Sequence, residues 1–285
     1  MKCDASKWKS LIEKFLSHRL AVLGAVILVV EILIAVFLPF IMDLDPYTSQ
    51  LGAFGAIPSA EHILGTDDIG RDLFARLIYG GRVSLFVGLC STCISIIIGV
   101  PLGLLAGFYR GMLETIIMRA ADIFMSFPAI MLILVLVSLV GPSIVSVMVV
   151  IGILGWTQFA RLVYSNVISV REQEYIEAAR SSGTKNGTII FKYILPNTLT
   201  PVLISFTFRT AQAIIMESSL SFLGMGVRPP EASWGNLMYD AQSIVVLSQK
   251  PWVWLPPGLA LVLTVLSINF LGDGIRDALD PKMKV

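Results

Sequence analysis

The sequence predicts an all-α integral membrane protein with six transmembrane helices, on the basis of its composition and of the length of its apolar segments. Hydrophobic residues make up 55% of the 285 residues and charged residues only 14%, compared with roughly 25% charged in ordinary soluble domains. A helix needs about 20 mostly apolar residues to cross the hydrocarbon of a bilayer. Six segments meet this requirement, namely 20–40, 83–108, 123–140, 143–159, 201–222 and 252–271.

The first apolar segment is predicted to be a retained span. A charged N-terminal tail, 1–19, precedes it, as in a signal peptide. However, the segment 20–40 is longer than the roughly 7–15 residues of a signal-peptide core. An external loop, 41–82, then leads to a core of five helices, 83–272, and the chain ends in a C-terminal tail, 273–285.

The external loop is expected to contain a short helix that lies on the membrane face. Apolar side chains recur at helical spacing over 73–79, and Gly80 and Gly81 are placed to end the helix. The acidic residues before it could hold a hard cation, but their position beside an Arg at a helix start favours N-capping. These residues are Asp67, Asp68 and Asp72, with His62 nearby.

Several spans contain residues that interrupt helices. Pro101, between Gly99 and Gly103, is predicted to break the second span, and Pro128 to bend the third. Pro201 stands at the head of the fifth span. Kinks of this kind serve either a pathway through the membrane or the packing of helices, and the sequence leaves both readings open.

The basic residues predict the orientation of the spans. Six spans place both termini on one side of the membrane, and 15 of the 21 Lys and Arg residues fall in segments on that side, against 5 on the other. Because basic residues are enriched in cytoplasmic loops, both termini and the loop 165–196 are expected in the cytoplasm.

Composition and motifs argue against several function classes. A net charge of +1 gives no indication of nucleic-acid binding. The three cysteines, Cys3, Cys90 and Cys93, are too few for a disulfide framework. With only two histidines and no hydrolase or metalloprotease motif, the chain offers no nucleophile or metal set and is expected to be non-catalytic.

A polar segment between the fourth and fifth spans contains a long gapped motif. It reads Glu-Ala-Ala at 177–179, Gly at 183 and Leu-Pro at 195–196. Ser169 and Glu172 have the spacing of a capping box, which predicts a helix that begins at Val170. Gly183 is placed to end this helix, because glycine adopts the left-handed C-terminal conformation without steric cost.

This motif resembles the cytoplasmic coupling loop of ABC importer permeases. It matches the family pattern at every fixed position but one, where Tyr193 replaces Ile and Ile194 follows. The resemblance implies a slim helix that enters a groove on an ATP-binding subunit. The expected ATPase-coupling residues are the apolar anchors Tyr175 and Ile176, the acceptor Glu177, and Ala178, Ala179, Gly183, Leu195 and Pro196.

Three further blocks resemble the second permease subunit of dipeptide, oligopeptide and nickel importers. They are 62–79, with His-x-Leu-Gly-Thr-Asp and Gly-Arg-Asp, 219–235, with Ser-Leu-Ser-Phe-Leu-Gly and Ser-Trp-Gly, and 272–281. The likeness covers nearly the whole chain. It implies a type I ABC importer permease fold with a cytoplasmic coupling helix, in the cytoplasmic membrane of a bacterium or archaeon.

The resemblance also implies the partners. They are a second, homologous permease subunit that completes a heterodimer, two ABC ATPase subunits and an extracytoplasmic solute-binding protein. The chain has no Gly-x-x-x-x-Gly-Lys-Ser/Thr phosphate loop, so it is expected to bind no cofactor itself. ATP and Mg are then used by the ATPase partners.

Polar residues inside the spans are candidates for the translocation path or for contact with the partner permease, because charges there are costly and usually face protein or water. The candidates are Arg209, Glu217, Ser218 and Ser221. A structural bond between helices is the alternative. Glu31 in the first span is expected to meet the other spans or to snorkel.

The class of cargo remains open between peptide and nickel. Peptide is favoured because no span contains a His, which a metal path would use. A secondary transporter is the rival outside this family, but it would normally display internal inverted repeats, and the sequence displays none that is convincing.

Overall fold

The computed structural model describes residues 12–279, and this part of the chain is helical apart from loops and one isolated β-bridge between Thr66 and Asp72. Two of the elements are not α-helices: η1 is a π-helix and η2 a 3₁₀-helix. From α2 onward, the elements are α2 (Arg19–Ile41), α3 (Leu73–Tyr109), α4 (Gly111–Met125), α5 (Ala129–Val140), α6 (Ile144–Arg171), α7 (Glu174–Ser181), α8 (Asn186–Ile189), η1 (Ile190–Ile194), α9 (Leu195–Phe222), α10 (Trp234–Leu237), η2 (Tyr239–Gln242), α11 (Ile244–Gln249) and α12 (Pro251–Leu279).

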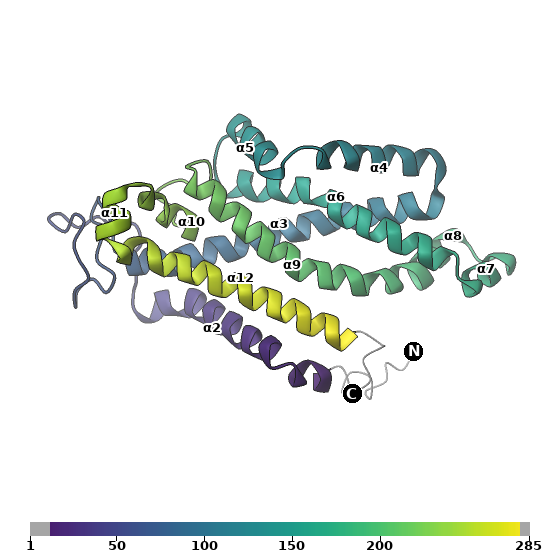
Figure 1. The fold of residues 1–285 in the computed structure, drawn as a ribbon, viewed down its shortest axis with the longest axis horizontal. Helices are drawn as coiled ribbons and strands as arrows, with labels where there is room; N and C mark the ends of the chain where they lie inside the picture. The colour runs from purple at the N-terminus through teal and green to yellow at the C-terminus, as the bar shows by residue number, and fades with distance from the viewer. Residues whose placement is uncertain (1–11, 280–285) are drawn as a thin grey trace.

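The spans agree with the predicted helical membrane fold. Within the described residues, 5 helices are long and apolar enough to cross a membrane, and the number rises to 6 if the bent pair α4–α5 is one span. The pair is bent by 90° at Phe127 and Pro128, where the sequence predicts a bend. α2 and α12 lie side by side along one flank, and α4 and α5 lie along the opposite flank (Figure 1).

The expectation that Pro101 and its neighbouring glycines break the second span is wrong. α3 continues through Pro101 to Tyr109 and packs along α6. A Cβ on Gly99 would lie 2.5 Å from the carbonyl oxygen of Trp156, and one on Gly103 would lie 2.5 Å from that of Ala160. Small residues allow membrane helices to approach this closely, so these glycines serve packing.

The interfacial helix predicted over 73–79 is not a separate element. α3 begins at Leu73, and the Asp72 side chain caps it by accepting a hydrogen bond of 2.8 Å from the backbone N–H of Ala75. Gly80 and Gly81 lie inside α3, where they admit the backbone of Ser233 and the ring of Trp234. The loop therefore ends at residue 72, and α12 extends past the predicted tail boundary at residue 273.

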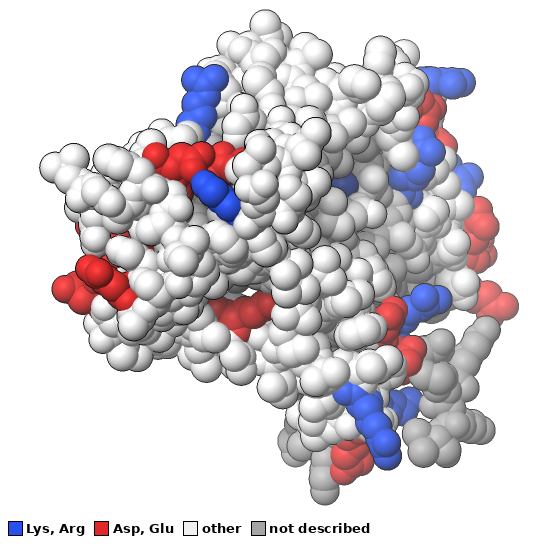
Figure 2. Space-filling model, turned by 60° about the vertical axis from the view of Figure 1, so that its left-hand side comes forward, with Lys and Arg blue, Asp and Glu red and all other residues white. Residues whose placement is uncertain are grey.

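A polar group inside the bundle is hydrogen-bonded between two helices. The Thr264 hydroxyl of α12 donates a hydrogen bond of 2.7 Å to Glu31 of α2, which confirms that Glu31 meets another span. On the face drawn in Figure 2, charged side chains gather toward the two sides, and most of the surface between them is neither acidic nor basic. This distribution suits a protein whose middle lies in hydrocarbon.

Candidate functional site

The polar loop between α6 and α9 folds into a short helix, α7, at one end of the bundle (Figure 1). The predicted start at Val170 is wrong. α6 runs on to Arg171, and the Ser169 hydroxyl donates to the carbonyl of Ser165 inside that helix instead of capping a new one. The apolar face of α6 continues through the fully buried Val167, so packing extends α6 past the capping box, and α7 begins at Glu174.

The predicted C-terminus of α7 is confirmed. Gly183 has a φ of 74°, the left-handed conformation that glycine adopts at little cost. Its N–H donates to the carbonyl of Arg180 at 2.9 Å, and the N–H of Thr184 donates to Ala179 at 3.1 Å. These two bonds form a Schellman motif, which satisfies carbonyls that the helix end leaves unpaired.

Ile176 was expected to be an apolar anchor for a partner, but it is not accessible. Its side chain is fully buried within this chain, in an apolar cluster that it shares with the ends of α3 and α6 and with η1. Only Tyr175, at 45% exposure, remains available as an apolar contact. The members of the cluster nearest in sequence to the loop are Val163, Val167, Ile189, Ile190 and Ile194, and Phe108 joins them from α3.

The outer face of α7 is polar and accessible. Glu177 and Ala178 are exposed, and Ala179 is half-buried. The guanidinium of Arg180 lies over the ring of Phe108, 5.3 Å from its centre. One face of α7 is therefore exposed, and its opposite face packs against the rest of the chain through Ile176.

An exposed salt bridge precedes α7 and a π-helix follows it. Arg110 pairs with Glu172 at 3.0 Å, just before the helix. After it, η1 places Ile194 in the buried cluster and leaves Tyr193 half-buried, so Ile194 fills the apolar position that the motif assigns to Ile. Leu195 packs against the same cluster, and Pro196 is exposed in the first turn of α9.

Arg209 of α9 borders two cavities of about 150 and 240 Å³. Its Nη1 donates to Gln212 Oε1 at 3.3 Å. Gln158 of α6 lines both cavities with it, and no acidic residue lines either one among the described residues. The structure thus places the half-buried Arg209 beside two hollows next to α6, with Gln158 and Gln212 among the polar residues around it.

The other polar candidates of α9 lie in the interior of this chain, which differs from the prediction that they face a path or a partner. Glu217, Ser218 and Ser221 are all at most 2% exposed. Glu217 accepts hydrogen bonds from Ser221 at 2.7 Å and from Ser84 of α3 at 2.9 Å. A buried carboxylate needs such donors, and here they join α9 to α3.

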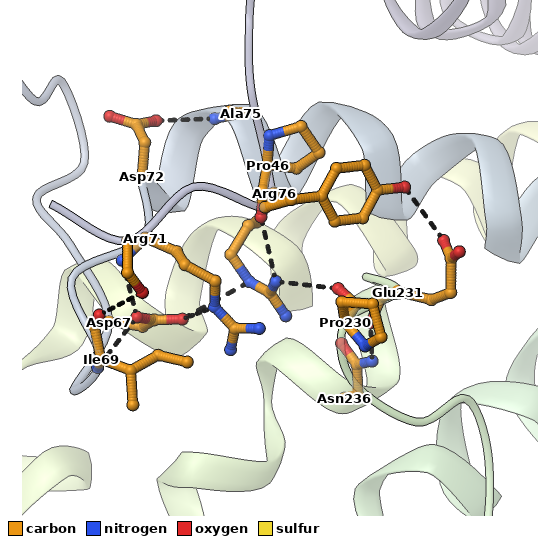
Figure 3. Close-up of polar contacts among 12 residues, drawn as sticks. Pro46, Asp67, Ile69, Arg71, Asp72, Ala75, Arg76, Pro230, Glu231 and Asn236 are labelled. Carbon is orange, nitrogen blue, oxygen red and sulfur yellow. Dashed lines mark hydrogen bonds and ion pairs between the residues drawn. The ribbon is translucent and has the colours of Figure 1, made fainter.

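A charged cluster at the opposite end of the bundle was not predicted as a site (Figure 3). Arg76 in the first turn of α3 is nearly buried, and its Nη1 donates to the carbonyls of Pro46 at 3.2 Å and Pro230 at 3.3 Å. Asp67 pairs with Arg71 at 2.7 Å. Arg76 therefore holds together the segments of Pro46 and Pro230, which are far apart in the sequence. An arginine within the apolar spacing of 73–79 is the one signal that could have indicated it.

None of the described residues form a group of three or more His, Cys, Asp or Glu side chains that could hold a metal ion. Asp72 caps α3 and also contacts His62 Nδ1 at 2.9 Å, and Asp67 is engaged by Arg71. The carboxylates of this loop thus act as caps and ion-pair partners.

An all-helical bundle with five or six membrane-crossing units defines a multi-pass membrane protein. The chain belongs to the family of binding-protein-dependent transport system inner membrane components, whose model matches residues 99–285. The N-terminal transmembrane domain of oligopeptide transport permease C matches residues 6–58.

Curated relatives extend the likeness over nearly the full length. The chain is 41% identical over 284 residues to the dipeptide transport system permease protein DppC of Alkalihalophilus pseudofirmus, covering 98% of this chain and 91% of that protein. It is 36% identical to the oligopeptide transport system permease protein OppC of Bacillus subtilis, covering 99% and 92%. The glutathione transport system permease protein GsiD of Pectobacterium atrosepticum is 40% identical, with coverage of 99% and 94%.

The fold has a solved counterpart in the MetNI methionine ABC transporter in an inward facing conformation. The TM-score is 0.60 at 21% sequence identity, and the match covers 72% of this chain and 97% of that one. The predicted type I ABC importer permease fold is therefore confirmed. The chain is a non-catalytic inner membrane component, and its system includes an ATPase and a solute-binding protein.

Proposed function

We propose that this permease imports di- or oligopeptides and forms half of the transmembrane pathway, with a second, homologous permease as the other half. The cargo rests on the relatives, whose names specify dipeptide, oligopeptide and glutathione transport. Within the described residues, the lack of a cluster of metal ligands gives the nickel alternative no structural support.

The observation on which the coupling role depends is the construction of α7. Its base is fixed by Ile176 and its end by the Schellman motif at Gly183, while Glu177 and Ala178 are exposed. A rigid, exposed helix between α6 and α9 suits transmission of movement from an ATPase subunit to the spans. In this arrangement two ATPase subunits bind ATP and Mg, and the permease binds neither.

The arrangement of the ends of the bundle supports the proposed orientation. The beginning of α2, the end of α12 and α7 lie toward the same end of the structure (Figure 1), and His18 contacts Asp277 at 3.5 Å. With α7 docked on ATPases, this end faces the cytoplasm. The α10–α11 end then faces the extracytoplasmic solute-binding protein.

Arg209 is proposed to face the translocation path. It borders hollow space between α4–α5, α6 and α9, and no carboxylate of the described residues pairs with it. An unpaired guanidinium inside a span is costly in hydrocarbon, so water or the partner permease must solvate it. Peptide carboxylates passing through the path are suitable ligands for this charge.

Reconstitution in proteoliposomes tests this function. The complex of the chain with its partner permease, ATPases and binding protein should hydrolyse ATP faster with trialanine and should accumulate it, while Ni²⁺ should have no effect. Glu177→Ala should reduce both activities, and the exposed Arg119→Gln on α4 serves as the matched surface control. Stimulation by Ni²⁺ alone would reassign the cargo, and a wild-type complex without bound ATPases would reject the coupling role.

A further inference from the structure

The external end of the chain contains a pocket that the transport function does not account for. Its volume is about 330 Å³, within the size range of small-molecule sites. Its charged lining comes from three separate segments: the loop before α3 with the first turn of α3, the loop after α9, and η2. These charged residues are Asp67, Arg71, Arg76, Arg228 and Asp240.

Positive charge exceeds negative charge in this pocket. Three guanidinium groups line it against two carboxylates, and the Asp67 carboxylate already pairs with Arg71 at 2.7 Å and with Arg76 at 3.7 Å. In Figure 3, the Arg71 and Arg76 guanidinium groups lie next to each other between α3 and the segment of Pro230 and Asn236. Two adjacent cations that share one carboxylate attract a further anion.

The donors of these arginines are only partly used. Each guanidinium has five N–H groups, and the side-chain hydrogen bonds of Arg71 within residues 12–279 use its Nε alone. The Nε of Arg76 is buried without a hydrogen-bond acceptor in the described part of the chain. Arg228 is exposed at the pocket, with no hydrogen bond or ion pair to a described residue. An incoming carboxylate would supply acceptors for donors that the fold itself leaves unmatched.

Asp240 adds a negative charge to this mainly positive pocket. It lies in η2, and no described residue forms an ion pair with it. Burial, and then the charges of Asp68 and Asp67, raise its pKa, while the charges of Arg76 and Arg71 act in the opposite direction. A cationic group of a ligand would supply the ion-pair partner that Asp240 lacks among the described residues.

We infer that this pocket is an external binding site for a small zwitterion, whose carboxylate is bound by Arg228 with Arg71 and Arg76 and whose ammonium group faces Asp240. This inference rests on the proposed peptide cargo, because a short peptide is such a zwitterion. The site would receive the solute at the outer face before it enters the path near Arg209. A carboxylate on the surface of the solute-binding protein is the other source of the same chemistry.

Equilibrium dialysis against the full transporter complex in nanodiscs, without binding protein, tests the site. Three probes separate the two ends of the ligand: trialanine, trialanine amide and N-acetyltrialanine. Arg228→Gln should weaken the binding of trialanine and N-acetyltrialanine about tenfold and leave the amide unaffected. Asp240→Asn should weaken trialanine and the amide by a similar factor and leave the N-acetyl form unaffected. Arg119→Gln should change none of them.

The results that would contradict the binding site differ from the result that would contradict the proposed cargo. Equal binding of the three probes to the wild-type complex, or binding unchanged in both pocket variants, would overturn the site while peptide uptake in proteoliposomes remained intact. If Arg228→Gln weakened only the docking of peptide-free binding protein, the carboxylate would belong to that protein and the inference would fail. If the complex imported no peptide at all, the proposed cargo itself would fail.

Discussion

Replacement of Gly183 by Val should uncouple α7 from the ATPases while leaving the spans inserted. The φ of 74° at this position places a side chain in the left-handed region, and apart from the two chain neighbours no heavy atom of the described residues lies within 4 Å of the Cβ that would be added. The cost therefore comes from the backbone alone. It amounts to about 1–2 kcal/mol for an ordinary L-residue and is larger for a β-branched one.

This cost is large in relation to α7. The helix has only 8 residues, and isolated helices shorter than about 12–15 residues are marginal in water. To escape the strain, the chain would give up the bonds from Gly183 to Arg180 and from Thr184 to Ala179. A loss of about 1–2 kcal/mol corresponds to a factor of about 5–30 in the population of the folded helix end.

Purified complexes provide the assay. Gly183→Val should either lose its ATPase subunits on size-exclusion chromatography or hydrolyse ATP at a rate that the loaded binding protein does not change. Gly187→Ala is the matched control, because Gly187 lies in the helix α8 with open space around its Cβ, and alanine favours a helix. Full ATPase association and normal stimulation in Gly183→Val would refute the reasoning.

Other consequences can be measured separately. In a background without native cysteines, Ser59→Cys should react with an impermeant thiol reagent from outside intact cells and Lys185→Cys should not, and labelling of the second would invert the topology. Ile176→Ala should destabilise the packing of α7 by about 2–5 kcal/mol, which limited proteolysis would detect as cleavage near α7, and unchanged protection would contradict the role of this side chain. Gly103→Val should lower the thermal stability of the solubilised protein, because a Cβ there would lie 2.5 Å from the carbonyl oxygen of Ala160, and a stability equal to wild type would show that α3 and α6 can separate.

The spans could be predicted from sequence because hydropathy over about 20 residues is a local property. The function of Gly99 and Gly103 could not. The same glycines suit a kink or a close helix contact, and only the position of α6, which is more than 40 residues away in the sequence, decides between them.

The segment around α7 was predicted correctly where local backbone conformation decides the structure and incorrectly where packing against other helices decides it. The end of α7 at Gly183 could be predicted, because the left-handed conformation of a glycine at a helix end is a local property of the chain. The start of the helix was misplaced, because burial of Val167 extends α6 through a sequence that would otherwise cap a new helix. Ile176 is buried in a cluster that includes residues of α3, which nothing in the motif indicates.

The fit between α3 and α6 limits how the protein can move during transport. Glycines of α3 admit the backbone of α6 at one end of the contact, and at the other end Gly152 and Gly155 of α6 admit Ile94 and Ser95 of α3. A slide of one residue along the helix axis, about 1.5 Å, would drive side chains into backbone along the whole contact. We therefore expect the two helices to move together as one rigid unit. The apolar cluster around Ile176 joins α7 to this unit and also to η1 and α9, so we expect a movement of α7 to reach α3, α6 and α9 together.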